Sequence, residues 1–298
     1  MNYNPGLIYI IIANLAQAFN PIWLKLAFKG GSDPYRILFA QAFFTLPLIF
    51  FYILLVDRDK FQVKKENFLT IVIQGICGYF FAAFLYNLAI AKMSASLVAL
   101  TFYTYPVFTL LGSWLVFKHK IAWLQWLGAV TVIIGVIFIA DPRLKGFDLF
   151  GFILAFLAAA SQAFAILYAE RNLKNVHPLT VFLYAQLGFI VPSLLTLPYW
   201  PEGPFLDPVS IQYGLILAFL SSCFGFLFVL LGQRTLPSGI TALLTTCRLP
   251  VSLLFVHLIL HEPFSPYMVI GAVLIFAGIV LGMNPLEKVK ETEKEKID

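Results

Sequence analysis

ANLAQAF at residues 13–19 is matched by AAASQAF at residues 158–164, almost half the chain length further on. The similarity extends outward from these two stretches. Phe39-Ala-Gln41 corresponds to Tyr184-Ala-Gln186, and Gly128-Ala-Val130 corresponds to Gly271-Ala-Val273. A repeat of this length indicates that the chain consists of two related halves.

The composition is that of a membrane protein. Hydrophobic residues make up 60% of the chain, charged residues make up 12%, and the mean hydropathy is +0.88. Soluble domains contain about 25% charged residues and about 45–50% apolar ones. The Lys and Arg residues that give the net charge of +5 lie in short connections between apolar runs, which argues against a nucleic-acid surface. Cys77, Cys223 and Cys247 lie inside apolar runs and show no disulfide or zinc spacing.

The apolar runs predict ten transmembrane helices, because a span needs about 20 mostly apolar residues. The first run is too long for a signal peptide and is interpreted as a retained helix. The predicted spans are Gly6–Phe28, Pro34–Val56, Phe68–Ala91, Ser94–Phe117, Ile121–Ala140, Leu149–Tyr168, Leu179–Tyr199, Ile211–Gly232, Ser238–Leu260 and Tyr267–Met283.

Each half contains five predicted spans, and five is odd, so the halves enter the membrane from opposite sides. We therefore expect an all-α membrane protein of two inverted five-helix repeats, residues 1–142 and 143–285, followed by a polar cytoplasmic tail at 286–298. Inverted repeats are typical of secondary transporters, which alternate between two conformations of the halves.

The distribution of Lys and Arg predicts the orientation. If the N-terminus is cytoplasmic, the cytoplasmic connections hold about twice as many Lys and Arg residues as the outer ones. Both termini are then expected in the cytoplasm, with the chain as a multi-pass protein of the cytoplasmic (inner) membrane.

Two turn-and-helix segments carry a resemblance to a known family. His261-Glu262-Pro263 followed by IGAVLIFAG (270–278) resembles the acidic turn and glycine-containing last helix of EamA-type exporters in the drug/metabolite transporter superfamily. The first half has LGAVTVIIG (127–135) but departs from the family at Lys118-His119-Lys120, where a glutamate is common. The resemblance implies ten spans and a cavity lined by spans one, three, four, six, eight and nine. It says nothing of the substrate.

Arg248 is the strongest candidate for a functional residue. It lies near the middle of the ninth span, where a charge is costly unless it faces water or a partner. Thr241, Thr245 and Ser252 share its helix face, and Pro250 is expected to interrupt the helix nearby. Because no Asp or Glu lies within any predicted span, Arg248 is expected to hold a carboxylate or phosphate of the substrate. The alternative is a structural role, in which Arg248 pairs with protein carbonyls and joins the halves.

Other polar residues of the spans are candidate substrate contacts or interhelical hydrogen-bond partners. Thr101 and Thr104 are favoured because the repeat aligns them with Thr245 and Arg248. Gln41 and Gln186 are assigned to the scaffold, because the family resemblance places their spans outside the cavity. The remaining candidates are Asn14, Gln17, Gln162, Tyr79, Tyr86 and Tyr105, and the third and fourth spans also carry Asn87 and Tyr103.

The function expected from these features is secondary transport of a small organic metabolite such as an amino acid, as an exporter or exchanger. The absence of an intramembrane carboxylate argues against proton coupling through such a group. A flippase for lipid or lipid-linked substrates is the alternative, and an intramembrane enzyme is a remote one. His257, His261 and Glu262 have ligand-like spacing but no second cluster, so neither metal nor cofactor is expected.

The expected partners are a small-molecule substrate, for which Arg248 leads us to expect an anionic group, and the lipid bilayer. No nucleic acid is expected, and the protein is expected to be a monomer or a homodimer. Gly128, Gly135, Gly271 and Gly278 are spaced by seven and are interpreted as helix-packing positions or a dimer seam.

Overall fold

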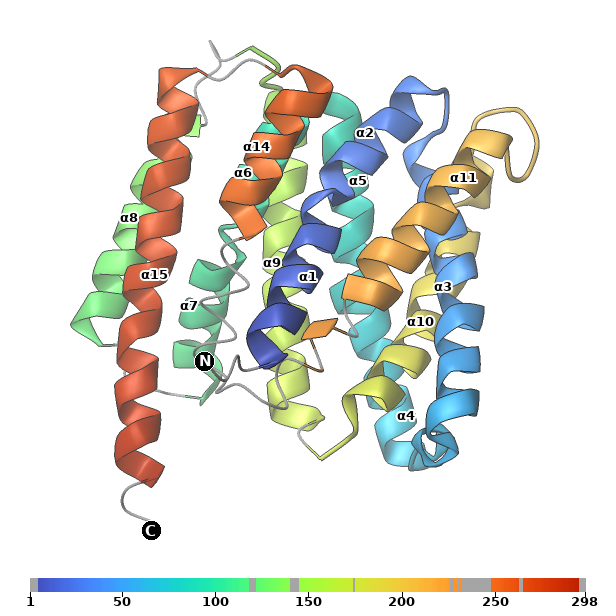
Figure 1. The fold of residues 1–298 in the computed structure, drawn as a ribbon, viewed down its shortest axis with the longest axis horizontal. Coiled ribbons are helices and arrows are strands. Elements are labelled where there is room, and N and C mark those ends of the chain that lie inside the picture. Colours follow the sequence, from blue (N-terminus) through green and yellow to red (C-terminus); the bar gives the residue numbers. More distant parts are fainter. Residues whose placement is uncertain are drawn as a thin grey trace.

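The computed structural model describes the chain outside residues 1–4, 118–121, 140–144, 174, 226–227, 230, 232–247, 263–264 and 295–298, and outside the side chains of 117, 170 and 283–294. This described part is all helical and contains no β-strand, which confirms the expected fold class. Figure 1 shows the helices packed as one bundle, with α1 beginning and α15 ending toward the same end.

The first half supplies α1 (Pro5–Ala18), α2 (Asn20–Lys29), α3 (Pro34–Val56), η1 (Arg58–Phe61), α4 (Lys65–Gln74), η2 (Gly75–Phe80), α5 (Phe81–Lys92), α6 (Ala95–Phe102), α7 (Tyr105–Phe117) and α8 (Trp123–Ile139). The second half supplies α9 (Leu149–Asn172), α10 (Pro178–Leu195), η3 (Leu197–Tyr199), α11 (Pro208–Ile216), η4 (Leu217–Phe224), α14 (Arg248–Leu260) and α15 (Pro266–Lys294). Helix α15 continues into the segment expected to be a polar tail.

Six of these helical segments are long and apolar enough to cross a membrane, and four more apolar helices are shorter, at 123–139, 208–224, 248–260 and 266–282. The chain is therefore a multi-pass membrane protein. The exact number of ten spans stays a prediction, because the shorter helices border residues that the structure does not describe.

Four of the predicted spans are interrupted midway. The first is divided into α1 and α2 at Phe19, just before Pro21, and the fourth is divided into α6 and α7 at Tyr103–Thr104, just before Pro106. Proline lacks an N–H and clashes with the carbonyl four residues earlier, which accounts for both breaks. The third and eighth spans contain the π-helical segments η2 and η4 at similar places in the two repeats. Single π-helical turns are frequent at functional sites.

Helices α8 and α15 pack together at one side of the bundle (Figure 1), through the glycines that the sequence analysis assigned to helix packing. A Cβ atom at Gly128 would lie 2.5 Å from the carbonyl oxygen of Gly278, and one at Gly135 would lie 2.8 Å from that of Gly271. The packing role is confirmed, and the contact lies within one chain. Gly128, near the start of α8, meets Gly278, and Gly135, further along α8, meets Gly271, which lies earlier in α15. The two repeat-related helices therefore run in opposite directions.

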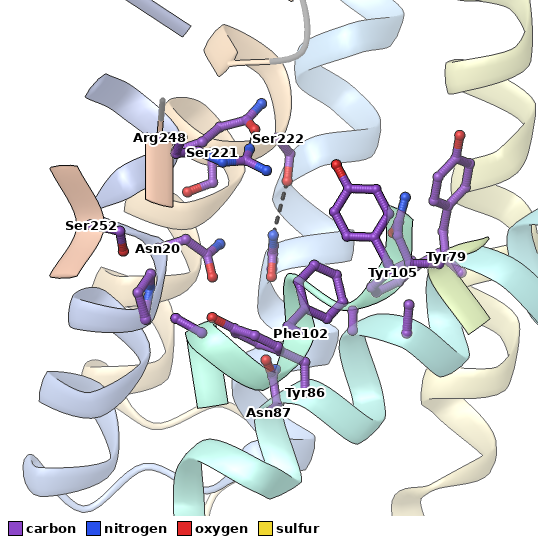
Figure 2. A pocket seen from close by; sticks show the side chains of 18 of the residues that line it. Asn20, Tyr79, Tyr86, Asn87, Phe102, Tyr105, Ser221, Ser222, Arg248 and Ser252 are labelled. Carbon is purple, nitrogen blue, oxygen red and sulfur yellow. Dashed lines mark hydrogen bonds between the residues drawn. The ribbon is translucent and has the colours of Figure 1, made fainter. Parts of the chain in front are cut away.

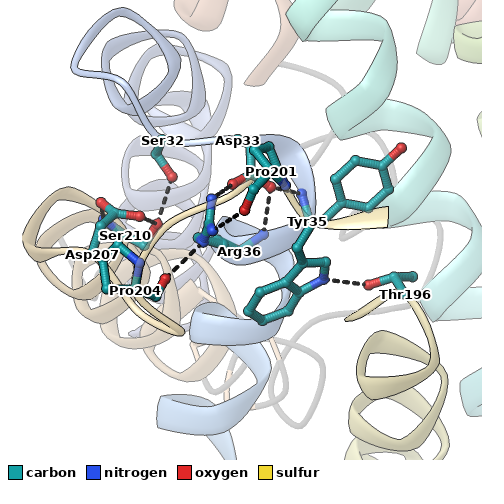
Figure 3. Close-up of polar contacts among 10 residues, drawn as sticks. Ser32, Asp33, Tyr35, Arg36, Thr196, Pro201, Pro204, Asp207 and Ser210 are labelled. Carbon is teal, nitrogen blue, oxygen red and sulfur yellow. Dashed lines mark hydrogen bonds and ion pairs between the residues drawn. The ribbon is translucent and has the colours of Figure 1, made fainter. Parts of the chain in front are cut away.

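Arg36 connects the start of α3 to the loop after α10 through hydrogen bonds (Figure 3). Its Nη1 donates to Asp33 Oδ2 at 2.6 Å, its Nε donates to Pro204 O at 3.1 Å, and its Nη2 donates to Pro201 O. Nearby, Asp207 caps α11 through the backbone N–H of Ser210. Burial acts to raise the pKa of the Asp207 carboxyl group, but hydrogen bonds from Ser210 and the backbone outweigh it and lower the pKa. The two repeats are thus joined at this end by satisfied polar contacts.

Glu262 joins the repeats a second time. Its carboxylate accepts hydrogen bonds from Ala95 N at 2.8 Å, Ser96 N at 3.0 Å and Ser96 Oγ at 2.7 Å, so it caps the N-terminus of α6. Anionic caps at this position satisfy orphan N–H groups and favour the helix dipole. The acidic turn of the second repeat therefore caps a helix of the first.

In the part of the chain that the structure describes, no cluster of His, Cys, Asp and Glu could hold a metal ion.

We predict that Gly128→Ala lowers the stability of the protein by about 1–3 kcal/mol, because the added methyl group meets backbone of α15 that cannot move aside freely. Gly282→Ala is the matched control, because a Cβ atom there meets nothing within 4 Å. Thermal unfolding in detergent measures both, and equal melting temperatures for the two variants would contradict the proposed packing.

We also predict that Glu262→Gln lowers the apparent melting temperature, with a loss on the order of 1 kcal/mol, because the charged acceptor of three hydrogen bonds becomes neutral. Glu202→Gln makes the same charge change at an exposed loop position and should leave the melting temperature unchanged.

Candidate functional site

A cavity of about 360 Å³ lies between the two repeats, and its wall is built mainly from the interrupted helices. Irregular backbone within a membrane is tolerated where it is buried in protein or lines a cavity. The polar wall residues are Gln17, Asn20, Gln41, Asn87, Gln162, Gln186, Ser221, Ser222, Arg248 and Ser252. The aromatic wall residues are Tyr79, Tyr86, Phe102, Tyr103, Tyr105, Phe182 and Phe189.

Arg248 projects into this cavity from the start of the described part of α14 (Figure 2). Its Nε donates to the hydroxyl of Tyr103 at 2.7 Å, and its Nη1 donates to Oε1 of Gln17. The guanidinium carbon also lies 5.8 Å from the centre of the Tyr103 ring, within the range of a cation–π contact. Arg248 therefore joins the second repeat to two helices of the first.

The partners of Arg248 among the described residues are neutral. The structure shows two ion pairs in its described part, Arg36 with Asp33 and Lys60 with Asp57, and neither includes Arg248. A phenol and an amide satisfy hydrogen bonds of the guanidinium group but do not compensate its charge. A charge taken out of water without a counterion is strongly disfavoured.

The break in the first span explains another contact between the repeats. Ile22 N and Trp23 N both donate to Phe19 O, which leaves Ala18 O without its usual donor four residues later. Ser252 Oγ supplies a hydrogen bond to Ala18 O at 2.9 Å. The same face of α14 thus carries Arg248 into the cavity and satisfies the backbone that the break exposes.

The structure brings five of the predicted site residues to the cavity wall in addition to Arg248. Gln17, Gln162, Tyr79, Tyr86 and Tyr105 lie there, and Tyr105 follows the break in the fourth span directly. Ser252, which was placed on the Arg248 face, lies there too. Whether any of them contacts a substrate stays a prediction.

Three other predicted site residues are buried away from the cavity. Thr101 and Thr104 donate to the carbonyls of Leu97 and Thr101, both at 2.8 Å, so their hydroxyls bond to nearby backbone. Asn14 is 8% exposed and does not line the cavity. Thr241 and Thr245 fall outside the described residues. The repeat alignment identified the correct turn of the fourth span, but Tyr103, next to Thr104, is the side chain that meets Arg248.

The assignment of Gln41 and Gln186 to a scaffold outside the cavity was wrong. Both line the cavity, and Gln41 Nε2 donates to Ser222 Oγ at 2.9 Å. The cavity extends as far as α3 and α10, because Phe182 and Phe189 of α10 also form part of its wall.

Sequence reasoning gave no role to Asn20, Phe102, Ser221 or Ser222, and it named Asn87 and Tyr103 only as further polar residues of the third and fourth spans; all six line the cavity. The Asn20-Pro21 pair is a turn signal that could have indicated the break in the first span. Ser221 and Ser222 lie within the π-helical segment η4, which no pattern in the sequence predicted.

Two helical repeats around a cavity with polar residues in its wall are typical of a membrane transporter. Residues 4–140 and 149–283 each match the model of the EamA-like transporter family, so the chain belongs to that family. An uncharacterized transporter of Clostridium kluyveri is 23% identical, over 97% of this chain and 96% of its own length. The uncharacterized transporter YcbK of Bacillus subtilis is 21% identical over the same shares of the two chains, 97% and 96%.

A solved structure described only as the crystal structure of a protein shares the fold. Its TM-score is 0.68 at 15% sequence identity, and the match covers 97% of this chain and 99% of the other. The resemblance found in the sequence is therefore confirmed at the level of family and fold.

We predict that Tyr103→Phe lowers the melting temperature of the protein without ligand, because Arg248 Nε loses its acceptor inside the bundle, with a loss on the order of 1–3 kcal/mol. Tyr105→Phe removes a hydroxyl from the same cavity wall without touching that hydrogen bond. The two variants are compared by thermal unfolding, and an equal effect of both would show that the Tyr103 hydroxyl does not hold Arg248.

Proposed function

We propose that the protein is a secondary transporter that exports or exchanges a small organic metabolite with an anionic group, such as an amino acid, through alternating access of its two inverted halves. The observation that carries this proposal is Arg248, which faces a cavity between the repeats and has only neutral partners there among the described residues. An anionic solute would supply the missing countercharge when it binds.

The contacts of Arg248 also suggest how binding could be linked to movement of the halves. Gln17 and Tyr103 belong to the first repeat, and both lie at interruptions of their helices. A ligand that competes for the guanidinium group would weaken these contacts between repeats. Alternating access requires such contacts to be exchanged during each cycle.

The distribution of basic residues supports a place in the cytoplasmic membrane with both termini in the cytoplasm. Labelling of single cysteines introduced after α15 and in the α10–α11 loop would test this orientation. Reaction of the first only from the cytoplasmic side, and of the second only from the outer side, is the expected result.

Counterflow into proteoliposomes tests the transport function directly. Vesicles preloaded with a mixture of amino acids and organic acids should accumulate a labelled member of the mixture through the wild-type protein. We expect Arg248→Gln to lower this uptake at least about thirtyfold, as expected for loss of one partner of a buried charge pair. Arg248→Lys keeps the charge, so a folded variant with partial uptake distinguishes loss of binding from loss of structure.

Uptake of fluorescent phospholipids, with no counterflow of soluble solutes, would instead identify a flippase.

We further expect that a proton gradient alone does not drive accumulation of the solute, because no carboxylate lies within the predicted spans. Accumulation driven by a pH jump in vesicles without counter-substrate would contradict this part of the proposal.

A further inference from the structure

Two unsatisfied hydrogen-bond donors lie on the wall of the cavity. Asn87 is 3% exposed and Ser221 is 9% exposed, and neither Asn87 Nδ2 nor Ser221 Oγ has a partner among the described residues. Leaving a buried donor unsatisfied costs free energy, and buried polar groups in native proteins are nearly always paired. A ligand with acceptor atoms would complete both groups.

These donors and Arg248 come from different repeats. Ser221 and Arg248 belong to η4 and α14 of the second repeat, and in the view of Figure 2 they lie at one edge of the cavity. Asn87 belongs to α5 of the first repeat and lies at another edge, beside Tyr86. The two unsatisfied donors are thus divided between two edges of the cavity, and Arg248 lies at the edge with Ser221.

Aromatic rings form another part of the cavity wall. Phe102 and Tyr105 flank the break in the fourth span, and Figure 2 shows them between the edge with Arg248 and the edge with Tyr79. Tyr86 packs edge-on against Phe102, with ring centres 5.1 Å apart. Aromatic walls of this kind favour a flat, apolar ligand body.

We propose that the substrate is a net-anionic organic acid with a flat apolar body and a second hydrogen-bond acceptor at its far end. Its anionic group binds Arg248 and Ser221 of the second repeat, and its distal acceptor binds Asn87 of the first. This inference rests on the proposed transport function and names the substrate class of the same cavity.

The charge of the cavity sets the order of preference among ligands. Arg248 is the charged residue of the described cavity wall, and no carboxylate is present there to receive an ammonium group. A cation would be repelled by Arg248. A zwitterion would bring a second charge that the wall does not compensate, so its desolvation opposes binding. The expected order is therefore anion, then zwitterion, then cation.

Three probes with one common body test this order: 3-(4-hydroxyphenyl)propanoate, tyrosine and tyramine. They are compared by ligand-induced thermal stabilisation of the purified wild-type protein and by inhibition of counterflow. We expect the propanoate to bind at least about tenfold more tightly than tyrosine, and tyramine to give no stabilisation. A fourth probe, 3-phenylpropanoate, lacks the distal acceptor and should bind more weakly than its hydroxylated analogue.

Variants of the two donors separate a binding role from a structural one. Ser221→Ala and Asn87→Leu each remove an unsatisfied buried group, so the ligand-free protein should melt at the same temperature or higher. Ser221→Ala should weaken binding of both propanoates about tenfold. Asn87→Leu should weaken binding of the hydroxylated probe and leave 3-phenylpropanoate unchanged.

Ser193→Ala is the matched control, because Ser193 is fully buried and its hydroxyl donates to Ile190 O at 2.6 Å, away from the cavity. It should not change the binding of any probe.

Asn87→Asp places a carboxylate in the cavity and should shift the binding preference from the propanoate toward tyrosine.

The outcomes separate this inference from the proposed function. If the protein carries out counterflow of tyrosine or tyramine and the propanoate does not inhibit it, the anionic substrate class is wrong. The proposed transport function would still stand. A lower melting temperature of the ligand-free Ser221→Ala and Asn87→Leu variants, with unchanged ligand binding, would assign both groups to the scaffold. Absence of counterflow for every solute would overturn the transport function itself.

Discussion

Backbone groups within a membrane have no water to bond with, so each carbonyl or amide freed by a helix break must find a partner inside the protein. The centre of this bundle is organised by that requirement. The break before Pro21 frees Ala18 O, and Ser252 from the other repeat satisfies it. The break before Pro106 places Tyr103 where it receives a hydrogen bond from Arg248. The interruptions therefore lie inside the bundle and beside the cavity, and at both of these breaks a side chain of the second repeat bonds to the first.

The two repeats have the same architecture but different chemistry. Their last helices pack through glycines arranged in reversed order, and their third helices both contain π-helical turns. At the cavity, both repeats contribute neutral amides and aromatic rings, but five of the seven rings come from the first repeat, while the guanidinium group and the three serines come from the second. A symmetric scaffold thus surrounds an asymmetric site, with the charge on one side and most of the aromatic surface on the other.

The sequence was sufficient for the fold class, the repeat and the family. Long apolar runs and matched motifs such as residues 13–19 and 158–164 are local signals that survive in a single chain. It also identified Arg248, because an isolated charge in an apolar run is conspicuous. It could not identify Tyr103 in place of Thr104, because the direction of a side chain at a helix break depends on tertiary packing. Gln41 and Gln186 were misplaced for a related reason, since the resemblance located spans and could not show how far between them a cavity extends. Substrate contact itself was a prediction from the sequence and is still one.

The cap that Glu262 forms on α6 has a consequence for the energetics of opening. Its three hydrogen bonds connect a turn of the second repeat to a helix of the first, so the two elements cannot separate there without exposing two backbone amides and a carboxylate together. In the first repeat the corresponding turn carries Lys118-His119-Lys120 and offers no carboxylate for an equivalent cap. Among the described residues, parting the bundle at the start of α6 therefore carries an electrostatic cost that is set by the sequence of one short turn.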